Sequence, residues 1–159
     1  MQLYILRHGV ADNGKPGGSD ADRALTADGK KKLRETLRVV QRAGVAPELI
    51  ISSPYLRAME TAAIATEIFA YKEALLQTKV LIPAEDPRPV WEEIRTHKSA
   101  ASLLLVGHEP LLSALAAFLL GAPSVYVDMK KGAILRIDIE SFGAQPRGVL
   151  KWMLVPKLV

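Results

Sequence analysis

Short apolar runs alternate with helical patterns along most of the chain. The runs that predict buried strands are Leu3 to Leu6, Leu49 to Ser52, Leu103 to Val106 and a weaker one, Leu76 to Ile82. Each run is followed by a turn signal and then by apolar residues three and four positions apart, which is the spacing of a helix face. Strands that alternate with helices in this way predict an α/β fold with a mostly parallel sheet.

Capping residues and prolines indicate where the intervening helices begin. Thr26 can cap a helix that ends at Gly44, because a threonine hydroxyl accepts from the first free N–H groups and glycine tolerates the helix stop. Pro54, Pro89 and Pro110 each fit the first turn of a further helix. With helices on both faces, the sheet would be the middle layer of a three-layer α/β/α sandwich.

The end of the chain has a different pattern. Leu135, Ile137 and Ile139 alternate with charged residues, so one face of this segment is apolar and the other polar. A second strand, Leu150 to Val155, follows after a glycine-containing loop. We expect an antiparallel pair of strands that completes the sheet.

Composition is that of a globular protein without cysteine chemistry. The 159 residues are 49% hydrophobic and 24% charged, so we expect one domain over residues 1–159. The absence of cysteine excludes disulfides, thiolate zinc sites and cysteine nucleophiles. The first residues lack the apolar core of a signal peptide, and His108 and Pro110 interrupt the apolar stretch Leu103 to Leu120. We therefore expect a cytoplasmic protein without a membrane span.

The net charge of +4 is a small excess that favours anionic ligands such as phosphate. The densest basic run is Lys30 to Lys32, but successive residues on a helix point about 100° apart. We interpret the run as a solvated face, because no aromatic residues interleave with it. The charge therefore gives no indication of a nucleic-acid partner.

Arginine and histidine follow three of the predicted strands. Arg7 and His8 come directly after the first strand, Arg57 lies in the first helical turn after the second, and His108 follows the fourth. Ligands of open α/β sheets bind at the carboxyl ends of the strands, so these side chains can converge on one crevice. Arginine forks and helix amino termini bind phosphate oxygens. Histidine is the natural nucleophile where cysteine is absent, so the pattern predicts a site for a phosphoryl group.

Each of these residues also has a structural interpretation. Arg57 could pair with Glu60, three positions on, and His108 before its proline could cap a helix. A metal site made of His8, His108 and a carboxylate lacks a close-spaced histidine pair, and we expect no metal. His97 falls in the last turn of a predicted helix, where a cation suits the helix dipole, so we expect a structural role for it.

The segment Arg7-His8-Gly9 after an apolar first strand resembles the RHG motif of the histidine phosphatase superfamily, whose fold is the phosphoglycerate mutase-like one. The resemblance extends over nearly the whole chain. The short length, the Arg-x-Leu-Thr segment and the late Lys131-Gly132-Ala133 resemble the SixA-type phosphohistidine phosphatase branch. The other matching segments are Arg23 to Gly29, Ser52 to Thr61 and Val106 to Pro110.

The resemblance implies a role for each residue of the predicted crevice. His8 would be the nucleophile that becomes phosphorylated, Arg7 and Arg57 would hold the phosphoryl oxygens, and His108 would donate to the same group. No metal or other cofactor is implied. We expect Arg23 near the mouth of the pocket, where it docks substrate or pairs with a nearby aspartate.

The general acid is the point where the chain departs from the mutases of the family, in which a glutamate after the third strand has this role. The nearest match is Ala84-Glu85-Asp86, so Glu85 is either a general acid or a solvated loop residue. A phosphorylated imidazole leaves more readily than an alkoxide and needs less help from an acid. A site without a strong acid therefore favours phosphohistidine over sugar phosphates, and a short chain with little lid suits a protein-borne group.

We predict a metal-independent phosphatase that forms a phospho-His8 intermediate and removes phosphate from phosphohistidine on a partner protein. One alternative keeps the chemistry and changes the substrate to a small phosphomonoester. The other, from a different class, is a non-catalytic module that binds phosphoryl groups or nucleic acid. The sequence does not predict the oligomeric state.

Overall fold

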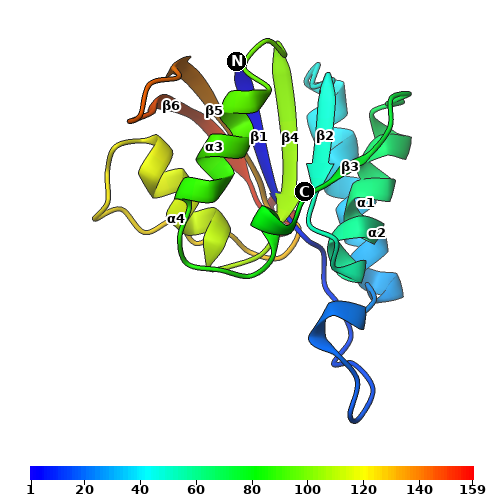
Figure 1. Cartoon of the computed structure of the whole chain (residues 1–159). Coiled ribbons are helices and arrows are strands. Elements are labelled where there is room, and N and C mark those ends of the chain that lie inside the picture. Colours follow the sequence, from blue (N-terminus) through cyan, green and yellow to red (C-terminus); the bar gives the residue numbers. More distant parts are fainter.

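The computed structural model describes residues 1–159 and is built on one six-stranded sheet (Figure 1). The strand order is β3-β2-β4-β1-β5-β6. Strands β1 to β4 pair in parallel, and β5 and β6 add an antiparallel pair beside β1. The strands are β1 (Gln2–Arg7), β2 (Leu49–Ser52), β3 (Leu76–Gln77), β4 (Ser102–Gly107), β5 (Ile134–Ser141) and β6 (Arg147–Leu154).

Helices cover both faces of the sheet, two on each side (Figure 1). Helices α1 (Ala27–Arg42) and α2 (Leu56–Ile68) pack on one face. Helices α3 (Arg88–Thr96) and α4 (Leu111–Leu119) pack on the other. The three-layer α/β/α sandwich with a mostly parallel sheet is confirmed.

The central strand β4 is covered on both faces, which explains why its segment is apolar throughout. Leu103 and Leu105 enter the core beneath α3 and α4, whereas Leu104 and Val106 enter the core beneath α1 and α2. Successive side chains of a strand point to opposite faces, so a strand that is covered on both faces needs apolar residues at every position. All six residues of β4 are buried.

The third strand is much shorter than the predicted Leu76 to Ile82. Only Leu76–Gln77 pair with β2, at the edge of the sheet where both side chains are exposed. The Thr78 side chain then accepts from the N–H of Val80 and starts a 3₁₀ turn, Lys79–Leu81. This turn buries Leu81 fully. The apolar residues of Leu76 to Ile82 therefore belong largely to a turn that inserts one side chain into the core, and not to a strand.

The ends of the helices follow most of the predicted signals. The Thr26 hydroxyl accepts from the N–H of Gly29 and caps α1, and Gly44 follows the helix with a φ of +87°. Of the prolines, Pro89 lies in the first turn of its helix, whereas Pro54 and Pro110 stand just before theirs. No helix has both the length and the apolar content that a membrane span requires.

We predict that Gly29→Ala destabilises the protein. A Cβ at this position would lie 2.3 Å from the carbonyl oxygen of Val10 and 3.0 Å from the Val10 nitrogen. Both contacts are with backbone, so α1 must move, and overpacking of this kind costs about 1–3 kcal/mol. Urea unfolding should show a lower midpoint with an unchanged slope. The control is a substitution that adds no close contact. Gly17 is exposed and has open space around it, but any side chain there would be strained by its positive φ, so Ala27→Ser in the first turn of α1 is the control.

Candidate active site

The polar residues meet at a topological switch point of the sheet. Strands β1 and β4 are neighbours, but the helix after β1 packs on one face and the helix after β4 packs on the other. A crevice forms at the carboxyl ends of two such strands. His8 follows β1, His108 follows β4, and Arg57 lies in the first turn of α2 next to them. The ring centroids of the two histidines are 5.0 Å apart.

His8 is held in one tautomer. Its Nδ1 lies 2.7 Å from the carbonyl oxygen of Gly9, which can only accept, so Nδ1 carries the proton. The Nε of Arg57 donates to the other ring nitrogen, Nε2, over 3.3 Å. Burial, with help from the charges of Arg57 and Arg7, lowers the pKa of His8 to about 4. The ring is therefore neutral at pH 7, with the lone pair of Nε2 in the crevice.

The low pKa of His8 gives a prediction for solution. The ring ¹⁵N shifts of His8 in an NMR titration should change with a midpoint near pH 4, about two units below an unperturbed histidine. Because the unfolded chain binds this proton at a higher pH than the native chain does, stability is complete above about pH 6.5 and falls as the pH drops toward 4. A midpoint above 6 would contradict the neutral, buried ring. Assignment uses His8→Ala.

Arg57 is buried and uses all its nitrogens. Besides His8, its Nη1 donates to the carbonyl oxygen of Asp20 over 2.6 Å, and its Nη2 donates to the Asp20 carboxylate over 2.9 Å. Its guanidinium carbon also lies 5.2 Å from the centroid of the Tyr55 ring. The alternative pairing with Glu60 is wrong, because the Glu60 carboxylate accepts from Lys30 and from the N–H of Leu25.

His108 is almost fully buried and leaves one ring nitrogen without a partner. Its Nε2 lies 2.8 Å from the hydroxyl of Ser53, and that hydroxyl already accepts from the N–H of Tyr55. The buried hydroxyl hydrogen has His108 as its acceptor, which places the ring proton on Nδ1, the atom without a partner. Burial lowers the pKa of His108 to about 3, so the ring is neutral. The His108 ring does not cap α4, but its carbonyl oxygen accepts from the N–H of Leu112 in the first turn of that helix.

Arg7 ends β1 and is also only partly satisfied. Its Nη1 donates to the carbonyl oxygen of Met129 over 2.6 Å, while its buried Nε has no partner. Desolvation lowers the pKa of Arg7, but an arginine remains charged at any physiological pH. The crevice thus holds two guanidinium groups, and its two buried side-chain nitrogens without a partner, Arg7 Nε and His108 Nδ1, both belong to predicted site residues.

Asp20 bridges the two arginines at the entrance of the crevice and was missed by the sequence analysis. Its carboxylate binds Arg57 through one oxygen and Arg23 through the other, each over 2.9 Å. The hydrogen bond from Arg23 is the main reason that the pKa of Asp20 is lowered. Arg23 itself also donates to the carbonyl oxygen of Asp12. The only sequence signal for Asp20 was its place three residues before Arg23.

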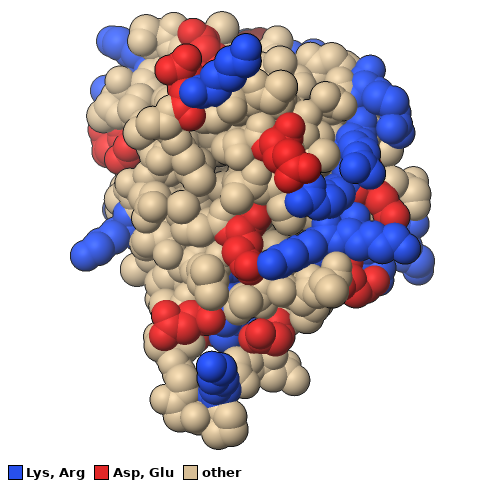
Figure 2. Space-filling model, turned by 90° about the vertical axis from the view of Figure 1, so that its right-hand side faces the viewer, with Lys and Arg blue, Asp and Glu red and all other residues tan.

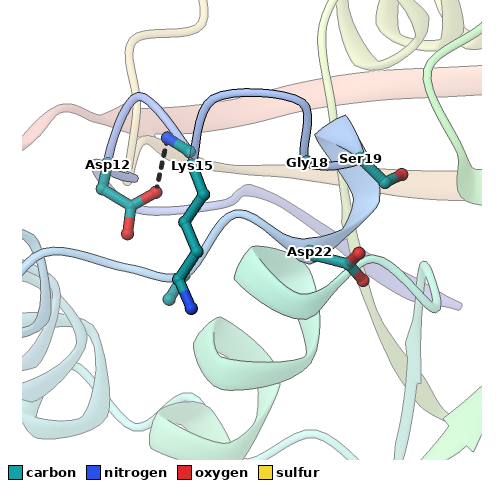
Figure 3. Close-up of a pocket in the computed structure, with 7 residues that line it drawn as sticks. Asp12, Lys15, Gly18, Ser19 and Asp22 are labelled. Atoms are coloured by element: carbon teal, nitrogen blue, oxygen red, sulfur yellow. Dashed lines mark hydrogen bonds between the residues drawn. The ribbon is translucent and has the colours of Figure 1, made fainter.

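The rest of the same loop encloses a separate hollow of about 410 Å³ (Figure 3). In it, the N–H of Gly14 donates to the Asp12 carboxylate over 2.9 Å. None of Arg7, His8, Arg57 or His108 lines this hollow, so it is distinct from the crevice. It is lined by Asp12, Gly14, Lys15, Gly18, Ser19, Asp22 and Ala24.

Glu85 is exposed in the turn between Leu81 and α3 and makes no hydrogen bond or ion pair. The turn begins close to the crevice, because a Cβ on Gly107 would lie 3.4 Å from the carbonyl oxygen of Leu81. The neighbouring Asp86 pairs with Arg88 and not with the crevice. His97 caps the end of α3 and lies 3.3 Å from the Glu93 carboxylate, as expected for a structural histidine.

Two further side chains position the crevice without having been predicted. The Thr61 hydroxyl accepts from the N–H of Gly9 and donates to the carbonyl oxygen of Arg57, so it links the loop after β1 to α2. Ser53 orients His108, as described above. Both lie in the Ser52 to Thr61 segment; Ser53 follows β2 directly, which was an available signal, whereas Thr61 lies inside α2 and had none. No group of three His, Asp or Glu side chains lies close enough to hold a metal ion.

The sheet order, the switch-point crevice and the pair of neutral histidines beside arginine define a class of phosphoryl-group enzymes and binding proteins. Residues 3–76 match the sequence model of the histidine phosphatase superfamily, branch 1. A protein of Picosynechococcus is 33% identical over 142 residues, which cover 85% of this chain and 83% of that protein. The chain therefore belongs to the histidine phosphatase superfamily.

Two further relatives place the chain more closely. The phosphohistidine phosphatase SixA of Escherichia coli is 27% identical over 98% of this chain and 94% of its own length. A solved structure of the protein histidine phosphatase SixA with tungstate superposes with a TM-score of 0.87, at 26% identity and 99% coverage of both chains. Within the superfamily, the chain is of the SixA type, with the phosphoglycerate mutase-like fold.

Proposed function

We propose that this protein is a phosphatase that hydrolyses phosphohistidine on a partner protein through a phospho-His8 intermediate. The observation that carries the proposal is the tautomer of His8. The Gly9 carbonyl fixes the proton on Nδ1, so the Nε2 lone pair faces the crevice next to Arg57. A neutral imidazole whose Nε2 accepts only a long hydrogen bond, over 3.3 Å from the Nε of Arg57, is arranged to attack phosphorus once that contact opens.

The remaining groups supply an anion site. Arg7 and Arg57 carry two positive charges, and the Nδ1–H of His108 and the Nε–H of Arg7 are buried donors without protein partners. An oxyanion bound there would satisfy both, and fixed donors of this kind stabilise the charge of a transferring phosphoryl group. The similar SixA structure was solved with tungstate, a tetrahedral oxyanion, which supports the assignment.

The chemistry takes two displacements at phosphorus. In the first, the Nε2 lone pair of His8 forms a P–N bond while the P–N bond of the substrate breaks, and the released ring nitrogen of the substrate takes up a proton from solvent. In the second, water attacks the phosphorus and the bond to His8 breaks, which regenerates neutral His8 with its proton on Nδ1 and yields inorganic phosphate that carries the protons of the water or passes one to solvent. Because one phosphoramidate replaces another in the first step, that step needs little help from an acid.

We also propose roles for two residues at the entrance, with residues 1–159 acting as one domain. Arg23 would reach the carrier of the phosphoryl group, since it already lies beside Asp20 at the mouth. Glu85 would donate a proton only to alkoxide leaving groups. Glu85→Gln should then slow the hydrolysis of phosphomonoesters and leave phosphohistidine hydrolysis unchanged. If the variant hydrolyses both substrates at the wild-type rate, Glu85 is a solvated loop residue.

The test of the proposed function compares substrates. A histidine phosphotransfer domain, phosphorylated chemically with phosphoramidate, is compared with a panel of sugar and nucleotide phosphates, and kcat/KM is measured for each. We expect the phosphorylated domain to be the best substrate by at least about tenfold. Higher kcat/KM values for the small esters would support the phosphomonoester alternative, and binding without turnover of any substrate would support the non-catalytic one.

A further inference from the structure

Helix α1 carries the whole charge excess of the protein. It contains six Lys and Arg residues against two acidic ones, a net +4, which equals the net charge of the chain. The rest of the chain is therefore balanced. Figure 2 looks onto the side of the molecule where α1 and α2 lie and shows Lys and Arg side chains gathered along one part of that face.

The basic run Lys30 to Lys32 is not the source of the free charge. Lys30 pairs with Glu60 over 2.6 Å, and Lys32 pairs with Asp28 over 2.8 Å. Lys31 is exposed and has no ion pair. Two of the three charges in the run that we interpreted as a solvated face are therefore neutralised, and only Lys31 stays unpaired.

A different set of residues forms a continuous basic stripe. Lys31, Arg34, Arg38 and Arg42 follow one another at intervals of three and four residues, which places them on one face of the helix. Arg34 pairs with Glu67, whereas Lys31, Arg38 and Arg42 are exposed and make no ion pair or side-chain hydrogen bond in the structure. We call these three residues the α1 stripe.

The surface along the α1 stripe is hollowed rather than convex. One open hollow of about 460 Å³ has Lys31 and Arg38 in its lining, and a second of about 460 Å³ has Arg38 and Arg42. Because Arg38 and Glu35 belong to both, the two hollows adjoin along the helix. From Lys31 to Arg42 the stripe is about 16 Å long, at 1.5 Å per residue.

The amino-terminal end of α1 lies at the same edge of the sheet as the crevice. The first turn of α1 packs on the residues directly after His8, because a Cβ at Gly29 would meet the backbone of Val10. The helix follows the loop that holds Asp20 and Arg23, in which the Asp20 carboxylate binds both Arg57 and Arg23. A molecule that inserts a phosphoryl group into the crevice can thus extend along the stripe.

We infer that the α1 stripe docks an acidic face of the protein that carries the phosphohistidine. The inference rests on the proposed function and adds where and how the partner binds. A partner protein fits better than nucleic acid, since no aromatic side chain on which bases could stack lines the hollows. Unpaired exposed cations accelerate encounter with a partner of opposite charge without changing the chemical step.

The experiment uses two synthetic peptides that each carry one phosphohistidine and ten further residues on one side, glutamate-rich in one peptide and lysine-rich in the other. Ten extended residues span about 33 Å, enough to reach along the α1 stripe. A third peptide with only two glutamates is too short to reach. Free phosphohistidine serves as the substrate without a docking segment.

For the wild type in about 20 mM salt, we expect kcat/KM to be at least about tenfold higher for the long acidic peptide than for the lysine-rich peptide or the short peptide. The difference should arise in KM and fade in about 0.5 M salt, where screening is strong. The triple variant Lys31→Glu, Arg38→Glu, Arg42→Glu should lose this preference and hydrolyse free phosphohistidine as the wild type does. Thermal unfolding checks that the variant folds.

A matched control reverses three basic residues elsewhere. Lys72, Lys98 and Lys151 are exposed and make no ion pair, so Lys72→Glu, Lys98→Glu, Lys151→Glu changes the net charge by the same amount. This control should keep the preference for the long acidic peptide. If both triple variants lose it equally, the effect comes from net charge and the inference about α1 is overturned.

Two other outcomes separate the docking inference from the proposed function. If the wild type hydrolyses all the peptides equally at low salt, docking on α1 is overturned while the proposed function stands. If it hydrolyses none of them and no free phosphohistidine, the proposed function itself fails. Binding of a labelled single-stranded DNA that depends on the α1 stripe, with no preference among the peptides, would assign the stripe to nucleic acid.

Discussion

His8→Ala is expected to abolish covalent labelling and to lower kcat by at least about 10⁴-fold, the scale on which enzymes lose activity with their nucleophile. No cysteine is present, and His108 has its Nε2 engaged by Ser53, so no other group can take over. Rapid quenching with labelled substrate should trap a phosphoramidate in the wild type. Such a bond is labile in acid and stable in base, unlike a phosphoserine ester.

The matched control for this experiment is His97→Ala. It removes the one histidine that lies outside the crevice, at the end of α3, and should leave both labelling and turnover at the level of the wild type. Equal labelling of His8→Ala and the wild type would place the nucleophile elsewhere, with His108 as the next candidate to be replaced.

Arg57→Ala is expected to keep the nucleophile and lose charge stabilisation. The guanidinium of Arg57 contacts His8 and is buried, and removal of one preorganised donor of this kind lowers kcat by about 10²–10³-fold. Label should still accumulate on His8, only more slowly. This slow labelling distinguishes the variant from His8→Ala, which forms none.

Two comparisons make the Arg57 result specific. Arg57→Lys keeps the charge but not the planar fork, so it should recover only part of the lost rate. Arg95→Ala removes an arginine of α3 that binds Glu92 and the carbonyl oxygen of Phe142, and it should leave kcat unchanged. A wild-type rate in Arg57→Ala would show that Arg7 alone holds the phosphoryl group.

The sequence predicted the residues of the crevice because each of them lies next to a strand. Arg7, His8, Arg57 and His108 follow strands that periodicity identifies, and the parallel order brings those ends to one edge of the sheet. Once the strand order is known, only the direction in which each side chain points remains to be determined. Asp20 escaped because its contact with Arg57 spans 37 positions along the chain and is made by a loop without periodicity.

The failures in the fold have a similar physical origin. The apolar residues of Leu76 to Ile82 satisfy a strand pattern, but at the sheet edge only Leu76–Gln77 find a partner and the chain turns to bury Leu81. A local sequence pattern does not predict which strand will lie at the edge of the sheet. The sequence also does not show which cations stay unpaired, because the ion pairs of Lys30 and Lys32 form only in the folded chain.

The carboxylate of Asp20 on Arg57 turns the binding of any oxyanion into an exchange. A phosphoryl group that takes the outer nitrogens of Arg57 displaces both the carbonyl oxygen and the carboxylate of Asp20, and that carboxylate still holds Arg23. The phosphoryl group therefore gains only the difference in free energy between its own charge-assisted contact with Arg57 and the one it displaces. Each such contact contributes about 1.5–3 kcal/mol. Inorganic phosphate gains only this difference, whereas a protein-borne phosphohistidine adds the contacts of its carrier. In the proposed reaction, the exchange would favour release of the phosphate product and limit inhibition by phosphate.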